Sequence, residues 1–187
     1  MAGPYARPLH RPHSAGGAVS RVTLVLGGAR SGKSRYAEGL AEPYGHRTYI
    51  ATAEPFDDEM RERITIHRAR RGASWTTRDI PIDLAAAIGE EQHFVLVDCI
   101  TVWLGNLMHR EADVLAEIEK LARVLEQTGA RVVLVSNEVG LSIVPENAMA
   151  RRFRDLQGLA NQRLAEVADE VVFVAAGLPL SLKSPAL

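Results

Sequence analysis

The segment VTLVLGGARSGKSRYAEGL, residues 22–40, constrains the fold more than any other part of this sequence. A strand-like apolar run is followed by Gly27, four intervening residues, and then Gly32-Lys33-Ser34. Glycines at these positions let the backbone turn tightly, so that successive N–H groups point at phosphate oxygens. The N-terminus of the helix that follows adds positive potential. The pattern predicts a buried strand, a phosphate-binding loop and a helix, in that order.

Apolar, β-branched runs alternate with helix-length segments along the rest of the chain. The expected strands are 22–27, 47–52, 94–100, 131–139 and 170–176, and the expected helices are 33–42, 56–72, 82–89, 111–128 and 147–168. Most of the strand-like runs are continuously apolar, which is typical of strands buried on both faces of a parallel sheet. The alternation predicts the α/β class, with helices flanking a mainly parallel sheet.

Length and composition are normal for a soluble globular protein of one domain. We expect one domain over residues 21–187, preceded by a disordered leader over residues 1–20 that is rich in Pro, Gly, Ala and Ser. The net charge of −1 gives no sign of a nucleic-acid partner. A single cysteine, Cys99, suits a reducing cytoplasm, and no apolar stretch is long enough to span a bilayer.

The residue types of the loop suggest how a nucleotide and a metal ion are held. Lys33 is expected to reach the β- and γ-phosphates, and the Ser34 hydroxyl is expected to coordinate Mg²⁺. The expected nucleotide-binding residues of the loop are Gly27, Gly28, Ala29, Arg30, Ser31, Gly32, Lys33 and Ser34. The alternative is a glycine-rich turn with an incidental lysine.

Two further strand ends carry polar residues. Asp98 closes the run FVLVD and is a candidate second ligand for Mg²⁺, or else a cap for the segment after it. Asn137 and Glu138 close the next run, where the carboxyl ends of parallel strands face a ligand crevice. They are placed to meet phosphates or a second substrate, or they form a turn. Both Asp98 and Glu138 are candidates for a general base.

The segment 56–72 predicts a helix with one mixed apolar and basic face. His67 lies near the middle of that face, among arginines that include Arg63 and Arg71. Nearby positive charge favours a neutral, nucleophilic imidazole, and arginines can bind phosphate through two hydrogen bonds. The pattern is consistent with an imidazole that attacks phosphorus. The alternative is a surface helix with solvated arginines and a histidine in the core or at a cap.

Several blocks together resemble a known family. They are GGARSGKS, YIATAEPFDDEMRERITIHRARR, DCIT, VVLVSNEVG and IVPEN, followed by the ADEV near the C-terminus, in this order and spacing. Between about Val22 and Lys183 the sequence resembles the bifunctional adenosylcobinamide kinase / adenosylcobinamide-phosphate guanylyltransferases of the CobU/CobP type. The phosphate loop alone is shared by many families, whereas IATAEPFDDEM and SNEVG…IVPEN are far more specific.

The resemblance implies two reactions in the assembly of the corrinoid nucleotide loop. ATP or GTP phosphorylates the aminopropanol arm of adenosylcobinamide, and GMP is then transferred from GTP to that phosphate through a covalent guanylyl-histidine. His67 matches the family's nucleophile, with Lys33 as the other catalytic residue. The resemblance adds Ala51, Thr52, Ala53, Arg68 and Arg71 to the nucleotide-binding residues. It also implies Mg²⁺ as cofactor, a RecA-like P-loop NTPase fold with a small antiparallel edge formed by AGLPLSLK, and a homotrimer.

Two rival functions share the phosphate loop. A P-loop kinase for another small molecule needs no nucleophilic histidine. A non-enzymatic GTP or ATP switch commonly reads guanine with an Asn-Lys-x-Asp element, whereas the comparable place here reads Asn137-Glu138-Val139-Gly140. In the last long helix, Arg154, Gly158 and Asn161 share one face, which predicts a subunit contact, a wall of the corrinoid site, or simply an exposed face.

Overall fold

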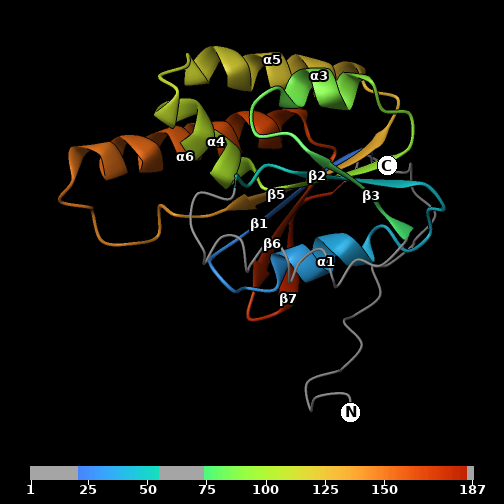
Figure 1. Ribbon diagram of the computed structural model, residues 1–187. Coiled ribbons are helices and arrows are strands. Elements are labelled where there is room, and N and C mark those ends of the chain that lie inside the picture. The colour runs from blue at the N-terminus through green and yellow to red at the C-terminus, as the bar shows by residue number, and fades with distance from the viewer. Residues whose placement is uncertain (1–20, 55–73, 185–187) are drawn as a thin grey trace.

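The computed structural model describes residues 21–54 and 74–184, which build one seven-stranded sheet with helices on both faces (Figure 1). The strand order is β3-β2-β4-β5-β1-β6-β7. The strands are β1 (Val22–Gly27), β2 (Arg47–Ala51), β3 (Thr76–Asp79), β4 (Phe94–Asp98), β5 (Arg131–Asn137), β6 (Glu170–Ala175) and β7 (Leu178–Lys183). The helices are α1 (Lys33–Gly39), α3 (Leu84–Gly89), α4 (Ile100–His109), α5 (Val114–Gln127) and α6 (Ala148–Val167).

Every pairing in the sheet is parallel except the last, in which β7 runs antiparallel to β6. The strand that carries Asp98, β4, is separated from the phosphate-loop strand β1 by β5. The predicted α/β, RecA-like fold with a mainly parallel sheet and a small antiparallel edge is therefore confirmed.

The helices divide unequally between the faces of the sheet. Figure 1 shows α3, α4, α5 and α6 over one face and α1 over the other. Successive residues of β1 point to opposite faces, so Leu24 and Leu26 join the core under the four helices while Val25 joins the core under α1. Because both faces are covered, the strand is buried along its whole length, as its continuous apolar run predicts.

Helix α5 shows how sequence pattern and packing agree. Its buried residues are Val114, Ile118, Leu121, Ala122 and Leu125, the spacing of one apolar helical stripe. The Asp113 side chain caps the helix by accepting a hydrogen bond from the Ala116 N–H at 3.1 Å. The helix ends at Gln127, with Thr128 as its C-cap residue, one residue before the expected end.

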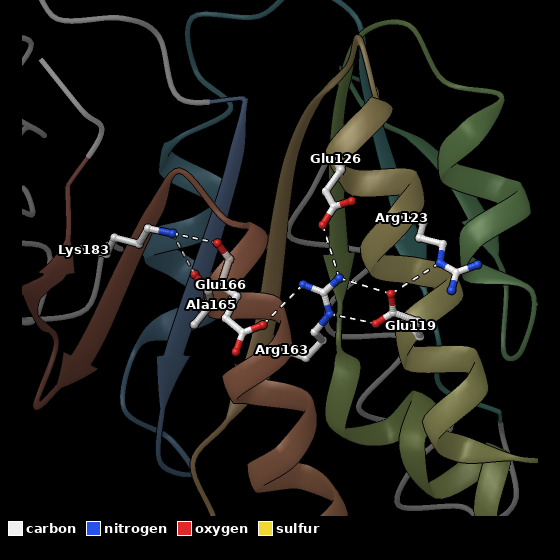
Figure 2. Close-up of polar contacts among 7 residues, drawn as sticks. All are labelled: Glu119, Arg123, Glu126, Arg163, Ala165, Glu166 and Lys183. Atoms are coloured by element: carbon white, nitrogen blue, oxygen red, sulfur yellow. Dashed lines mark hydrogen bonds and ion pairs between the residues drawn. The ribbon is translucent and has the colours of Figure 1, made fainter.

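Charged side chains join α6 to its neighbours on both sides (Figure 2). Arg163 donates to Glu119 of α5 at 2.8 Å and to Glu126 at 3.2 Å. On the other side, the Lys183 ammonium donates to the carbonyls of Ala165 and Glu166 at 3.0 and 2.9 Å. A cation at the carboxyl end of a helix also complements the helix dipole, so Lys183 ties β7 to the end of α6.

The element boundaries correct several expectations. The run 94–100 is not one strand, because β4 ends at Asp98 and α4 begins at Ile100. The sequence patterns predict neither the helix α4 nor the strand β3. The other strand and helix ends lie within about three residues of those expected, although the helix 111–128 begins only at Val114. The leader 1–20 and the helix expected over 56–72 lie outside the described residues.

No helix in the described ranges 21–54 and 74–184 has both the length and the apolar character needed to cross a membrane.

Candidate phosphate-binding site

The phosphate loop connects β1 to α1, as the sequence predicts. Strand β1 ends at Gly27 and α1 begins at Lys33, with Gly32 as the residue before the helix. Gly32 has φ 98° and Arg30 has φ 56°, so the chain twice enters the left-handed region within the loop. Glycine reaches that region without steric cost, and the conformation at Gly32 turns the chain into the helix.

Close packing explains the first and last glycines of the loop. A Cβ atom on Gly27 would lie 2.5 Å from the carbonyl oxygen of Val174 and 2.6 Å from the Ser31 Oγ. A Cβ on Gly32 would lie 3.2 Å from the Cα of Gly177. The backbone of the loop therefore lies directly against the turn between β6 and β7.

The β6–β7 turn is also hydrogen-bonded to the loop. The Gly177 N–H donates to the Ser31 carbonyl at 2.8 Å, and Ala176 and Gly177 have φ 51° and 80°. The family resemblance places the small antiparallel edge in AGLPLSLK, directly around this turn. The sequence gives no sign that the turn supports the loop, because the two segments are far apart along the chain.

Lys33 is held at the loop by its own backbone. Its ammonium donates to the Gly28 carbonyl at 3.2 Å. The Ser31 Oγ is buried and has no hydrogen-bond partner among the described residues. The loop thus presents a cation, a helix N-terminus and an unpaired hydroxyl at the same end of the sheet, which is the donor set that a phosphate group needs.

The predicted metal ligand Asp98 lies at the same edge of the sheet, at the end of β4. Its Oδ2 accepts a hydrogen bond from the Tyr49 hydroxyl at 2.8 Å, which fixes the orientation of the carboxylate. The pKa of the neighbouring Cys99 thiol is raised to about 11, first by burial and then by the negative charge of Asp98, while the positive charge of Lys33 lowers it. The charges of Asp98 and Lys33 therefore both act on the Cys99 thiol.

The end of β2 supports this edge from the other side. Thr52 is fully buried, and its Oγ1 donates to the Cys99 carbonyl at 2.8 Å and accepts from the Cys99 N–H at 3.0 Å. The Asn106 amide donates to the Thr52 carbonyl at 2.8 Å. The Thr52 side chain is thus engaged inside the protein, while Ala53, one residue further, is partly exposed. Contacts of Ala51, Thr52 and Ala53 with a nucleotide stay predictions.

A buried polar cluster fixes the end of β5 against α6 and α4. Asn161 Oδ1 accepts from Ser136 Oγ at 2.7 Å and from Gln157 Nε2 at 3.0 Å, and Asn161 Nδ2 donates to the Asn137 carbonyl at 3.1 Å. The Asn137 N–H donates to Thr101 Oγ1 at 2.8 Å. The sequence does not reveal this cluster, because its members come from three separate elements.

The position of Asn161 corrects the interpretation of the α6 face. Asn161 is only 7% exposed and faces the protein's own sheet, so it forms neither a subunit contact nor a wall of a ligand site. An added Cβ on Gly158 meets nothing within 4 Å among the described residues, so this glycine is not required for a close approach there.

A pocket of about 240 Å³ opens beside the loop. Its lining residues are Gly28, Glu138, Val139, Leu141, Ser142 and Phe173. Glu138 thus stands at the site, as its place after β5 suggests. The remaining predicted site residues, His67, Arg68 and Arg71, lie outside the described residues.

A mainly parallel sheet with a glycine-rich loop and a lysine between its first strand and helix defines an α/β nucleotide-binding protein of the P-loop class. Residues 23–182 match the family model of cobinamide kinase / cobinamide phosphate guanyltransferase. The chain belongs to this family, as the resemblance indicated.

Three similar proteins match this chain over nearly the whole of their own length. The bifunctional adenosylcobalamin biosynthesis protein CobP of Pseudomonas aeruginosa is 46% identical over 88% of this chain and 98% of its own. The bifunctional adenosylcobalamin biosynthesis protein CobU of Salmonella typhimurium is 41% identical over 87% of this chain and 99% of its own. The CobU protein of Escherichia coli is 40% identical over 87% of this chain and 99% of its own. Among solved structures, the P4 protein from bacteriophage phi6 in complex with ADP aligns with a TM-score of 0.45 and 16% identity, covering 96% of this chain and 59% of that one.

Proposed function

We propose that this chain phosphorylates adenosylcobinamide with ATP or GTP and then transfers GMP from GTP to the product, giving adenosylcobinamide-GDP. The observation that carries the proposal is the phosphate loop, with Lys33 and the N-terminus of α1 at the carboxyl edge of the sheet. Membership of the cobinamide kinase / cobinamide phosphate guanyltransferase family supplies the acceptor.

In the kinase step, the loop N–H groups and Lys33 hold the triphosphate and offset the charge that develops on it. Ser34, in the first turn of α1, and Asp98 would hold Mg²⁺. Hydroxyl and carboxylate oxygens are ligands that Mg²⁺ prefers, and both groups lie at one edge of the sheet. When bound, the ion neutralises charge on the phosphate oxygens.

In the guanylyl step, a nitrogen of His67 attacks the α-phosphorus of GTP. The bond to the bridging oxygen breaks, pyrophosphate leaves with the electron pair, and GMP stays on the imidazole. An oxygen of adenosylcobinamide phosphate then attacks the same phosphorus and releases His67. Arg68 and Arg71 are proposed to stabilise the charge on the phosphate, since guanidinium groups match its geometry.

We also propose that the chain works as a homotrimer, as the family resemblance implies. An apolar row on the edge strand β7 is consistent with self-association, because Leu178, Leu180 and Leu182 are 67, 60 and 57% exposed. Light scattering after size exclusion tests this part independently of the activity.

The test of the function is product analysis. The purified chain is incubated with adenosylcobinamide, Mg²⁺ and either ATP alone or ATP with GTP, and the corrinoids are separated and weighed by mass spectrometry. ATP alone is expected to give adenosylcobinamide phosphate, and added GTP is expected to give adenosylcobinamide-GDP. Phosphate product without GDP product would favour the rival of a kinase without guanylyltransferase activity.

A further inference from the structure

The pocket lies directly beside the phosphate loop. One of its walls is the backbone of Gly28, so the pocket and the loop share a residue. At about 240 Å³ it is smaller than the roughly 300–1,000 Å³ of pockets that enclose drug-sized ligands. It can take a short side arm of a large molecule but not a macrocycle.

One carboxylate lies in this pocket, and the backbone fixes it to the loop. The Glu138 N–H donates to the Gly27 carbonyl at 3.1 Å, so the residue keeps a constant distance from the first glycine of the loop. Its Oε1 accepts from the Gly140 N–H at 2.5 Å. Its Oε2 has no hydrogen-bond partner within the ranges 21–54 and 74–184, so this oxygen is available to a ligand in the pocket.

The segment that follows β5 and contributes Leu141 to the pocket carries three exposed apolar side chains. Leu141, Ile143 and Val144 are 85, 93 and 60% exposed in the segment between β5 and α6. Apolar side chains gathered in this way beside a site mark a ligand or partner surface. Because Leu141 also lines the pocket, the apolar surface continues directly into the space beside the loop.

From these contacts we infer that the pocket receives the hydroxyl arm of the corrinoid, that Glu138 is the general base of the kinase step, and that Leu141, Ile143 and Val144 contact the apolar periphery of the corrin ring. The inference rests on the proposed function, since it takes cobinamide as the acceptor. A small pocket for the arm and an open apolar rim for the ring match a ligand that is large but reacts at the end of one chain.

The arm's hydroxyl oxygen forms a bond to the γ-phosphorus, and its proton passes to the Glu138 carboxylate. The bond between the γ-phosphorus and the β–γ bridging oxygen breaks, and the nucleoside diphosphate leaves with the electron pair. Asp98 is less suited to accept this proton, because it is the proposed ligand of Mg²⁺.

The test compares Glu138→Gln with Glu146→Gln, an exposed glutamate in the same segment that is not part of the pocket. Glu138→Gln is expected to lower kcat for adenosylcobinamide phosphorylation about 100- to 10,000-fold, the usual contribution of a general base. The acid limb of the pH profile of kcat/KM is expected to disappear with it. ATP affinity and the GMP adduct formed from GTP are expected to stay unchanged, because neither needs the acceptor; Glu146→Gln is expected to leave all four quantities unchanged.

A second pair of variants tests the rim. Leu141→Ser and Ile143→Ser are expected to raise KM for adenosylcobinamide about tenfold or more with KM for ATP unchanged, since each loses the burial of an apolar side chain against the ring. Both side chains are solvent-exposed, so these changes do not threaten folding.

Different results contradict the proposed function and the proposed role of the pocket. Wild-type protein that makes no adenosylcobinamide phosphate overturns the proposed function. If the wild type is active and the Glu138→Gln variant binds ATP and keeps kcat within twofold of the wild type, Glu138 is not the general base. Rim variants with unchanged KM for the corrinoid overturn its docking on Leu141 and Ile143.

Discussion

The change Asn161→Leu tests whether the buried polar cluster holds the end of β5 in place. The leucine side chain has the same number and branching of heavy atoms as that of asparagine, but it forms no hydrogen bonds. The change removes the three hydrogen bonds of Asn161 to Ser136 Oγ, Gln157 Nε2 and the Asn137 carbonyl. Gln157 keeps a partner, because its Nε2 also donates to Ser136 Oγ at 2.9 Å.

The size of the effect follows from the groups that lose a partner. The Ser136 hydroxyl proton loses its acceptor, and one lone pair of the Asn137 carbonyl loses its donor. Ser136 is fully buried. A buried polar group left without a partner costs about 1–3 kcal/mol. We therefore expect a loss of about 3 kcal/mol in the free energy of unfolding, which corresponds to a fall of roughly 6–12 °C in Tm at about 2–4 °C per kcal/mol.

Urea unfolding followed by circular dichroism measures this free energy, and an unchanged m-value shows that the native and unfolded states keep their compactness. Leu159→Ala is the matched control, because Leu159 lies on the same helix and is 48% exposed. We expect the control to change stability by no more than about 0.5 kcal/mol. A loss below about 1 kcal/mol for Asn161→Leu would refute the account of the cluster.

Three further predictions follow from single contacts. Gly27→Ala places a Cβ 2.5 Å from the backbone oxygen of Val174, so calorimetry is expected to show ATP affinity lowered about tenfold or more; unchanged affinity contradicts the packing argument. Hydrogen bonds from Arg163 lower the pKa of the Glu119 carboxyl, so its stabilisation exists above the ordinary carboxyl pKa and is lost as pH falls through the lowered value. The urea midpoints of wild type and Glu119→Gln are expected to differ at neutral pH and to converge in acid; a constant difference contradicts this. Because the pKa of Cys99 is raised to about 11, iodoacetamide is expected to label the native thiol at pH 8 far more slowly than the thiol in urea, and equal rates would show an ordinary thiol.

Sequence patterns predicted the parts of the fold that depend on local, repeated signals. The runs 22–27 and 170–175 are apolar at nearly every position because helices cover both faces of the sheet, and this signal is contained in the run itself. The strand β3 gave no such signal, because its sequence TTRD is polar and lies at the edge of the sheet. In the helix α4, the β-branched start ITV continues the apolar run of β4, so the boundary after Asp98 was not visible.

The same distinction applies to the site. The phosphate loop was predicted residue by residue because its members are contiguous and each has a type that the geometry demands. Long-range contacts were not predictable in this way. The contact of Gly177 with Ser31 joins segments 146 positions apart, since the hydrogen bond runs from residue 177 to residue 31. The burial of Asn161 depends on which face of α6 meets β5, which periodicity alone left open.

The central claim is that a triphosphate held by the phosphate loop is attacked by one histidine of the chain. Peptide mass spectrometry after incubation with GTP and Mg²⁺ tests it most directly, with wild type, Lys33→Ala and His67→Ala treated in parallel. We predict one GMP on the peptide that contains His67 in wild type, and none in either variant. A GMP adduct that persists in His67→Ala, or that forms at full yield in Lys33→Ala, would contradict the claim.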